Sequence, residues 1–388
     1  MKIPISKPYF GKEEAAAIGF PLETGWVVQG PHVKKFEEKF SAITKSPYCA
    51  ATSSCTTALH IAVAALGLKP GDEVIVPSFT WIATANVVEY MGAKPVFCDI
   101  ELNTFNLDVA QLEKCITPRT VGIIPVHLFG LMAPMPAVMD IARKHKLWVV
   151  EDAACGFGAA INGKHAGVIG DVGCFSFHPR KSVTTGEGGM LTTDNLKLDV
   201  LFRSLRDHGA SLSDLERHEN KKSYLLPDYA LLGYNFRMTD FQGALGCVQL
   251  DRAEWILKQR RSLAKKYDDR LSNLPWLRTP LIPAGYTHGY QAYVCLFSPE
   301  TLSFNKAEAL RERRNKLMTD LEDQGIATRQ GTHAPVFTAY YRKKYGFRPD
   351  QFPNAFMAEA LTLSLPLFPQ LQEDEHAFVC DALLKAKV

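Results

Sequence analysis

The feature that most constrains this chain is a regular alternation of short apolar runs with stretches of helical periodicity. The apolar runs are continuous rather than interleaved with polar residues, which is typical of strands covered on both faces, as in a parallel sheet. This pattern predicts an α/β domain with a mostly parallel sheet flanked by helices, and an unrelated α+β mixture is the alternative. The predicted strands are 73–77, 95–99, 122–126, 147–151 and 173–177, and the predicted helices are 56–66, 83–91, 108–115 and 137–145.

The chain changes character after about residue 250. Charged helical stretches then alternate with connections rich in proline and glycine, around a short apolar run at 292–297. We therefore expect a large α/β domain over 1–250, including an N-terminal arm, and a smaller α+β domain over 251–388. A long helix near 240–271 is expected to join them. The polar stretch 208–222 is expected to be a mobile surface loop of the kind that often rims a site.

Composition and charge exclude several functions. The 388 residues carry 44 basic and 41 acidic side chains, a formal net charge of +3, so no nucleic-acid partner is expected. The nine cysteines form no Cys-x-x-Cys pair, so neither a metal site nor a disulfide framework is expected. The N-terminus lacks the apolar core of a signal peptide, and the weakly polar stretch 121–139 contains prolines that a membrane-spanning helix would not tolerate. The sequence predicts a cytoplasmic protein with no membrane contact.

Reactive side chains follow two of the predicted strands. Strand 147–151 is followed at once by Asp152, and strand 173–177 contains Ser176 near its end, with Lys181 a few residues further on. Ligands of open α/β sheets bind at the carboxyl ends of strands, so these residues are expected to face one crevice. A lysine amine, a carboxylate and a hydroxyl suit pyridoxal phosphate (PLP). Alternatively, Asp152 could be a turn residue and Lys181 a solvated lysine.

A phosphate group needs further donors. Residues 52–57 are rich in Ser and Thr and directly precede an apolar helical pattern. Free N–H groups at the start of a helix form an anion site, although a plain Ser/Thr cap is equally consistent with this segment. Trp81 follows a strand end and could stack on a flat ring, or could simply be a packed core aromatic.

Motifs along essentially the whole chain resemble those of the DegT/StrS family of nucleotide-sugar aminotransferases. These are PLP enzymes with the aspartate-aminotransferase (type I) fold, and the resemblance implies that fold and the activity of a transaminase. The motifs that carry it are at 5–8, 25–31, 71–77, 126–130, 151–154, 175–181, 184–189, 233–238 and 363–367.

The resemblance implies roles for matching residues. Lys181 would be the Schiff-base lysine, Asp152 would pair with the pyridinium nitrogen, and Trp81 would stack on the ring. Asn235 would reach into the partner subunit's phosphate site, so a homodimer with shared active sites is implied. The phosphate would be held by Cys55 and Thr56, through backbone amides, and by Ser176.

Two residues depart from the family pattern. The phosphate loop usually reads Ser-Gly-Thr, but Cys55 replaces the glycine here, which puts the tight turn in doubt. Cys155 stands where the family usually has Gln or His beside the cofactor. Because a thiol is a poor hydrogen-bond donor, its contribution to cofactor binding is expected to be weak.

The resemblance also implies a reaction. L-Glutamate would give its amino group to the cofactor, with pyridoxamine phosphate as the intermediate form, and a nucleotide-linked keto sugar would receive it. Residues 181–189 carry the Gly-Glu-Gly-Gly ending of family members that aminate C4 of a 4-keto-6-deoxyhexose, whereas Gly-Asp-Gly-Gly is commoner in those that act at C3. The candidate sugar contacts are Trp26, Gln29, His127, His178, Arg206, His208, Arg329 and His333, and each histidine could equally be structural.

Other readings of the chain are less consistent with its motifs. A PLP-dependent sugar dehydratase would carry His in place of Lys181. A non-catalytic regulator on the same fold would have no need of an imine-forming lysine. A nicotinamide dehydrogenase is not favoured because no Gly-x-Gly-x-x-Gly follows an early strand.

Overall fold

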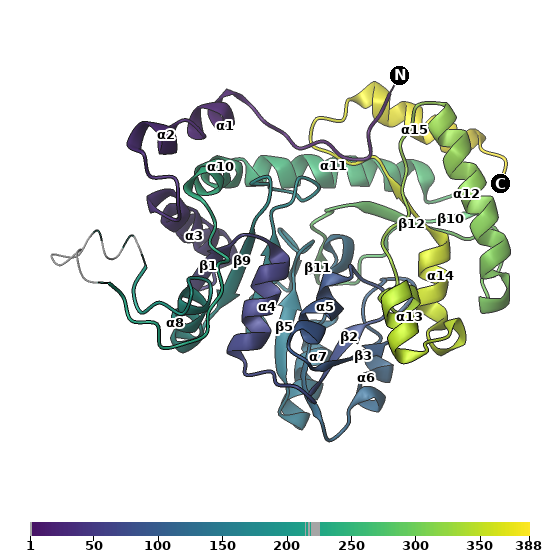
Figure 1. The fold of residues 1–388 in the computed structure, drawn as a ribbon. Coiled ribbons are helices and arrows are strands. Elements are labelled where there is room, and N and C mark those ends of the chain that lie inside the picture. Colours follow the sequence, from purple (N-terminus) through teal and green to yellow (C-terminus); the bar gives the residue numbers. More distant parts are fainter. Residues whose placement is uncertain (1, 214, 216–217, 219–225) are drawn as a thin grey trace.

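A seven-stranded sheet forms the centre of the molecule (Figure 1). The computed structural model describes residues 2–213, 215, 218 and 226–388. The strand order is β1-β9-β8-β5-β4-β2-β3. The strands are β1 (Tyr48–Thr52), β2 (Glu73–Pro77), β3 (Lys94–Cys98), β4 (Thr120–Ile123), β5 (Trp148–Asp152), β8 (Val172–Ser176) and β9 (Gly189–Thr193).

The five predicted strands are all present, and all five pair in parallel. β1 and β9 were not predicted, and they add an antiparallel edge beside β8. Val149 and Val150 of β5 are fully buried and belong to two different hydrophobic clusters, one on each face of the sheet. This two-sided burial explains why the strand sequences are apolar without alternation.

The helices between the strands match the predicted ones closely. The predicted helix 108–115 is a short α-helix that ends in a 3-10 turn, Glu113–Cys115. Three further helices precede β1, and another follows β9. The helices of this part are α1 (Lys12–Ala17), α2 (Phe20–Thr24), α3 (Pro31–Thr44), α4 (Cys55–Ala65), α5 (Ala83–Tyr90), α6 (Val109–Leu112), α7 (Met135–His145) and α8 (Leu196–Leu205).

The predicted single helix near 240–271 is two helices in the structure. α10 (Asp240–Asp251) and α11 (Ala253–Leu271) are separated by Arg252, which caps the end of the first and the start of the second. Arg252 bonds Glu14 of α1 through Nε (2.8 Å), so its side chain fastens the junction to the N-terminal helices. α11 then runs from the large sheet toward the C-terminal elements (Figure 1).

The C-terminal elements surround a three-stranded antiparallel sheet, in the order β10-β12-β13. Its central strand β12 (Tyr293–Phe297) coincides with the predicted apolar run. The third sheet, which is also small, joins β6 (Ala160–Ile161) and β7 (Lys164–His165) to β11 (Tyr286–Thr287). The other elements are β10 (Leu277–Arg278), α12 (Ala307–Asp323), α13 (Ala339–Tyr345), α14 (Pro353–Leu361), β13 (Thr362–Leu365) and α15 (Glu373–Lys385).

The N-terminal arm crosses to this C-terminal part. Ile3 donates to the carbonyl of Gly325 (2.8 Å) and accepts from Ala327 (2.9 Å), and Ile5 accepts from Leu367 (3.1 Å). The arm is thus an additional strand-like segment beside elements that are more than 300 residues away in the chain.

Of the loop predicted at 208–222, residues 214, 216–217 and 219–222 lie outside the described residues. The described start of this segment is bonded to a later part of the chain, because Ala210 forms a β-bridge with Tyr229. Among the described residues, no helix is both long and apolar enough to cross a membrane.

Candidate active site

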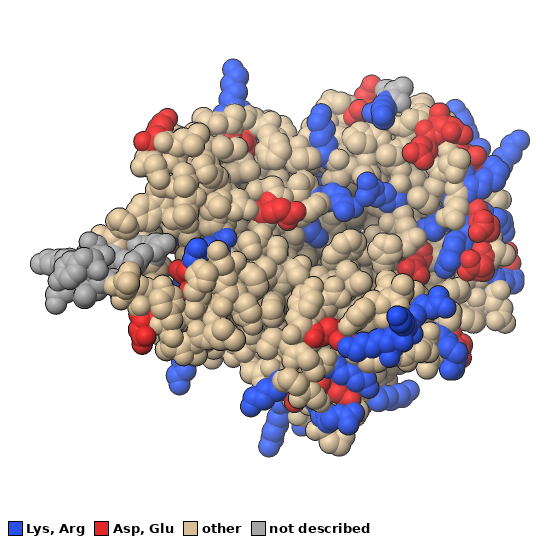
Figure 2. Space-filling view, in the orientation of Figure 1, with Lys and Arg blue, Asp and Glu red and all other residues tan. Residues whose placement is uncertain are grey.

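A cavity of about 670 Å³ lies where the ends of β5 and β8 face the C-terminal elements. Much of its wall comes from the loops and helix starts that adjoin the strands of the large sheet, and residues 328–333 and β13 supply the opposite side. Ile5 and Ser6 of the N-terminal arm complete the lining. The face drawn in Figure 2 is hollowed near its middle, with basic side chains beside the hollow.

Asp152 lies at the end of β5 and its carboxylate is held from two sides. The Thr84 hydroxyl donates to Oδ2 (2.7 Å) and the Ala154 amide donates to Oδ1 (3.1 Å). Burial raises the pKa of Asp152 above its ordinary value, although both hydrogen bonds favour the charged form. A cationic partner in the cavity would therefore be strongly stabilised by this carboxylate.

Lys181 lies in the turn that follows β8, with its backbone amide bonded to the carbonyl of His178 (2.8 Å). Its Nζ donates to Sγ of Cys155 at 3.2 Å. Burial lowers the pKa of Lys181, but Cys155, Cys55 and the carboxylate of Asp152 together outweigh burial, so the net pKa is raised. The amine of the cofactor-free protein is therefore an ammonium.

An anion site lies at the start of α4. The Ser54 side chain caps the helix by accepting from the amide of Thr57 (3.1 Å), which leaves the N–H groups of Cys55 and Thr56 at the cavity wall. Gly189 lets this helix start approach β9, since a Cβ there would lie 2.7 Å from the Cys55 nitrogen. Ser176 lines the same cavity. Two amides, a hydroxyl and a helix N-terminus fit a phosphate group.

The phosphate loop forms its turn with Cys55 in place of the usual glycine. Cys55 is the first residue of α4 and does not belong to the residues with positive φ, so the turn does not need glycine's freedom. Its thiol donates to the carbonyl of Cys174 (3.6 Å). Burial raises the pKa of Cys55 well above its ordinary value, so the thiol stays neutral.

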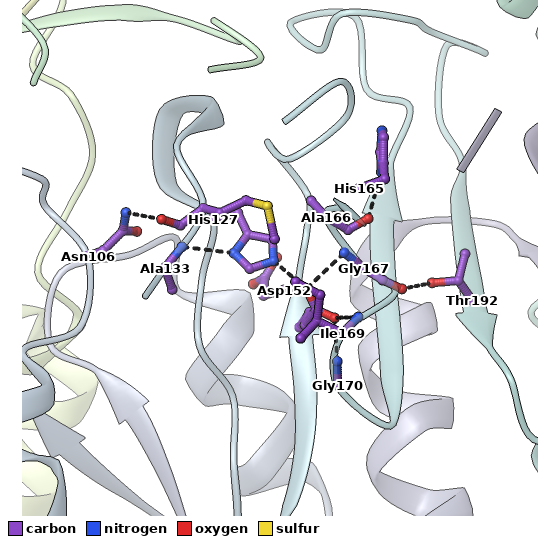
Figure 3. Close-up of polar contacts among 12 residues, drawn as sticks. Asn106, His127, Ala133, Asp152, His165, Ala166, Gly167, Ile169, Gly170 and Thr192 are labelled. Atoms are coloured by element: carbon purple, nitrogen blue, oxygen red, sulfur yellow. Dashed lines mark hydrogen bonds and ion pairs between the residues drawn. The ribbon is translucent and has the colours of Figure 1, made fainter. Parts of the chain in front are cut away.

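A buried carboxylate one residue before Asp152 fixes the end of β5, and Figure 3 shows the residues around it, His127, Gly167, Ile169 and Gly170. Glu151 accepts hydrogen bonds from the amides of Gly167 (2.8 Å), Ile169 (2.6 Å) and Gly170 (2.6 Å) and contacts the ring of His127 (2.7 Å). Burial alone would raise the pKa of Glu151, but His127 and the backbone donors lower it, so the side chain is an anion.

His127 is a structural residue, which corrects its interpretation as a sugar contact. Its ring is fully buried and lies outside the cavity lining. Nδ1 accepts from the amide of Ala133 (3.2 Å), so Nε2 carries the proton that is donated to Glu151. Its backbone amide also donates to the carbonyl of Asp152 (3.0 Å), so His127 holds β5 at two points.

Arg206 is also structural rather than a sugar contact. It is 3% exposed, and its guanidinium bonds Glu37 (2.6 Å) and the carbonyl of Ala51 (2.7 Å). The guanidinium of Arg237 likewise pairs with Asp207. The remaining predicted residues that do not line this chain's cavity are Trp26, Gln29, His208 and Asn235.

The other predicted residues do share one cavity. Its lining includes Cys55, Thr56, Trp81, Asp152, Cys155, Ser176, Lys181, His178, Arg329 and His333. Sequence reasoning missed Thr84, which reaches Asp152 from α5, as well as Arg180 and Gln291, which line the cavity. A threonine three residues after Trp81 was a usable signal, but no local pattern points to Gln291. Among the described residues, no group of three or more His, Cys, Asp or Glu side chains could hold a metal ion.

The fold and this cavity together define a PLP-dependent aminotransferase. The cavity offers an amine, a buried carboxylate and a phosphate cup, so the residues present fit the cofactor. The chain belongs to the DegT/DnrJ/EryC1/StrS aminotransferase family, which matches residues 8–384. Within that family it is a sugar aminotransferase.

Relatives and solved structures match over nearly the full length. The chain is 37% identical to the uncharacterized protein MJ1066 of Methanocaldococcus jannaschii, over 99% of this chain and 97% of that protein. It is also 37% identical to the spore coat polysaccharide biosynthesis protein SpsC of Bacillus subtilis, covering 98% and 96% of the two chains. Spr1654 of Streptococcus pneumoniae, assigned as a sugar aminotransferase and solved in its pyridoxamine phosphate form, superposes with a TM-score of 0.90 at 28% identity, covering 98% of each chain.

Proposed function

We propose that this enzyme transfers an amino group from L-glutamate to C4 of a nucleotide-linked 4-keto-6-deoxyhexose. The observation that carries the proposal is that Lys181, Asp152 and the phosphate cup at the start of α4 line one cavity. Two arginines and two histidines also line this cavity and would face a second, larger substrate: Arg180, Arg329, His178 and His333. Amination at C3 of a 3-keto sugar is the alternative.

The residues of the cavity divide the chemistry between them. PLP, when bound, supplies an electron sink for the bond that breaks at the amine-bearing carbon. Asp152 would hold the positive charge of the ring nitrogen, and the amides of Cys55 and Thr56 with Ser176 would bind the phosphate. Lys181 Nζ would take the proton from the α-carbon of glutamate, for which it must be neutral. Pairing of Asp152 with the ring nitrogen neutralises one of the charges that raise the pKa of Lys181.

Residues beyond the cofactor support an anionic sugar substrate. Arg180 and Arg329 are exposed, line the cavity, and make no ion pair within the described residues. Guanidinium groups bind phosphate and carboxylate oxygens well, so this pair suits a sugar diphosphate. The preference for C4 rests on the Gly186-Glu187-Gly188-Gly189 sequence beside Lys181.

We also propose a homodimer in which each subunit completes its partner's active site. Asn235 is exposed and lies outside its own chain's cavity, as expected for a residue that reaches another subunit. Large apolar side chains in the same segment are open to solvent, with Leu226 at 83% and Leu232 at 92% exposure. Contiguous exposed apolar residues of this kind mark protein interfaces.

The pathway and the compartment are likewise proposals. The name of SpsC supports a role in polysaccharide biosynthesis. All nine cysteines are free, which suits a reducing compartment, and we propose the cytoplasm.

A substrate panel tests the proposed reaction. The purified enzyme is incubated with glutamate and with UDP-, GDP- and dTDP-linked 4-keto and 3-keto sugars, and products are identified by mass spectrometry and NMR. We expect amination at C4 of a 4-keto sugar and none with Lys181→Ala. Exclusive amination of 3-keto sugars, or full activity of Lys181→Ala, would contradict the proposal.

A further inference from the structure

Cys155 contacts Lys181 in a way that the proposed chemistry does not use. The distance of 3.2 Å from Nζ to Sγ marks the one hydrogen bond that this ammonium makes with the described residues. Asp152 is near enough for its charge to act on the amine. Nevertheless, Lys181 and Asp152, both of them described, form no ion pair within 4.0 Å. An ammonium and a buried carboxylate thus lie in one cavity without pairing.

The backbone fixes the position of the sulfur. Cys155 lies in a tight turn that is closed by a hydrogen bond from the amide of Gly156 to the carbonyl of Ala153 (2.8 Å). The turn packs closely, because a Cβ on Gly156 would lie 3.0 Å from Ala166. The preceding amide, that of Ala154, is bonded to Asp152. Sγ therefore stands at a defined place beside the carboxylate rather than on a loose loop.

Without the sulfur, no hydrogen bond among the described residues would hold the ammonium, and the negative charge that acts on it is the carboxylate of Asp152. Both oxygens of that carboxylate already accept one hydrogen bond each, but a carboxylate has further lone pairs to offer. Separating a buried ion pair costs several kcal/mol because each charge is left without a partner. The ring nitrogen of the cofactor needs the same carboxylate, so such an ion pair would compete with cofactor capture.

We propose that Cys155 is a positioning residue that holds the Lys181 ammonium apart from Asp152 while the cofactor is absent. The carboxylate thereby stays open to the ring nitrogen. This inference rests on the proposed roles of Lys181 and Asp152. It concerns the step at which the cofactor enters, so the association rate should change and the dissociation rate should not.

Rates of cofactor binding test this role. Cofactor-free protein is mixed with PLP, and association and dissociation are followed separately by absorbance. We expect Cys155→Ala to slow association about tenfold, equivalent to about 1.4 kcal/mol in the barrier, with dissociation unchanged. Cys155→Ser, which keeps an acceptor, should be slowed less. Cys115→Ala is the matched control, because Cys115 is also half-buried but bonds Gln111. Association of Cys155→Ala at the wild-type rate would overturn the inference.

A double variant identifies the cause. In an Asp152→Asn background the competing carboxylate is gone, so Cys155→Ala should slow association less than twofold further. A second tenfold loss there would overturn the inference, because the sulfur would then act without Asp152. Thermal melting checks the fold, and Cys155→Val replaces any variant that fails to fold.

The same samples separate this inference from the proposed function. Borohydride reduction followed by mass spectrometry shows whether wild-type protein carries the cofactor on Lys181. Absence of that label would refute the proposed function. Presence of the label together with equal association rates would refute only the role of Cys155.

Discussion

One hydroxyl group sustains the charge of Asp152. The hydrogen bond from Thr84 (2.7 Å) lowers the pKa of a carboxyl group whose pKa burial raises. Thr84→Val should therefore raise that pKa further and weaken PLP binding by roughly tenfold or more, since a hydrogen bond to a charged group contributes about 1.5–3 kcal/mol. The loss should grow as the pH falls. Equilibrium titration with PLP at several pH values measures it.

Thr84→Ser is the matched control, because it keeps the hydroxyl and removes only a methyl group. Equal PLP affinity of the Val and Ser variants would show that the hydroxyl does not support Asp152.

His288 makes stability depend on pH. Burial, with Arg261 beside the ring, lowers the pKa of His288 to about 3. The unfolded pKa is about 6.5, so between these values only the unfolded chain binds the proton. Stability should then be complete above about pH 6.5 and fall by about 1.4 kcal/mol per unit as the pH drops toward 3. Urea unfolding at pH 7.5 and 5 measures this slope.

His288→Asn should reduce that slope, because no group that titrates in this range is left at the position. The exposed His145→Asn serves as control and should keep the wild-type slope. An unchanged slope in His288→Asn would contradict the prediction.

The sequence predicted the position of a site residue most directly when that residue follows a recognisable strand. Lys181 and Asp152 do lie together in the cavity because strand ends in a parallel sheet converge, and the strands were recognisable. His127 and Arg206 were wrongly predicted to contact the sugar. Each is buried beside a carboxylate, His127 beside Glu151 and Arg206 beside Glu37, and no local sequence pattern shows these pairings. The roles of Lys181 as the Schiff-base lysine and of Asp152 as the partner of the ring nitrogen stay predictions, as does the ring-stacking role of Trp81, which is 57% exposed.

The connection between α3 and α8 depends on a single carboxylate. Glu37 of α3 bonds Arg203 (2.8 Å) and Arg206 (2.6 Å) of α8 and its C-cap, and also accepts from the amide of Ala51 (2.8 Å). Burial raises the pKa of Glu37, but the two arginines outweigh it and the net pKa is lowered. Glu37→Gln should destabilise the fold by about 3–5 kcal/mol, because it leaves the buried Arg206 guanidinium without a carboxylate partner. Urea denaturation gives the change.

Glu38→Gln is the neighbouring control, since Glu38 is exposed on the same helix. It should change stability by less than about 0.5 kcal/mol. Equal effects of the two substitutions would rule out the proposed importance of the Glu37 contacts.

The strands were predicted best where both faces are buried, because such strands have continuous apolar sequences. The five parallel strands were found for that reason, whereas β9 begins directly after a glycine-rich turn and its threonines gave no clear period. β1 contains two alanines in its five residues, so its strand signal was weak. The helix junction at Arg252 was invisible, because residues on both sides favour helix and the break is fixed by contacts to Glu13 and Glu14.

The proposed shared active sites can be tested by mixing two inactive proteins. Lys181→Ala and Asn235→Ala should each have little activity alone. After unfolding and refolding together, about half of the dimers are mixed, and each mixed dimer holds one intact site, so roughly a quarter of wild-type activity should return. An activity assay on the refolded mixture, with each variant refolded alone as control, checks this. No recovery would contradict shared sites, and a monomeric mass in solution would contradict the dimer.

The division of the chain into two domains at residue 250 stays a prediction.

The N-terminal arm imposes an order of events on the synthesis of this protein. Residues 3–6 leave the ribosome more than 300 residues before 325–327 and 367, whose backbone groups bond Ile3 and Ile5. Until those later residues are translated, the backbone partner of Ile5, Leu367, is absent, so the part of the cavity wall that Ile5 and Ser6 form is missing. Nascent chains that stall before residue 325 would contain both Lys181 and Asp152 and still have an open, incomplete pocket. Completion of the catalytic centre therefore has to wait for the segment beyond residue 325.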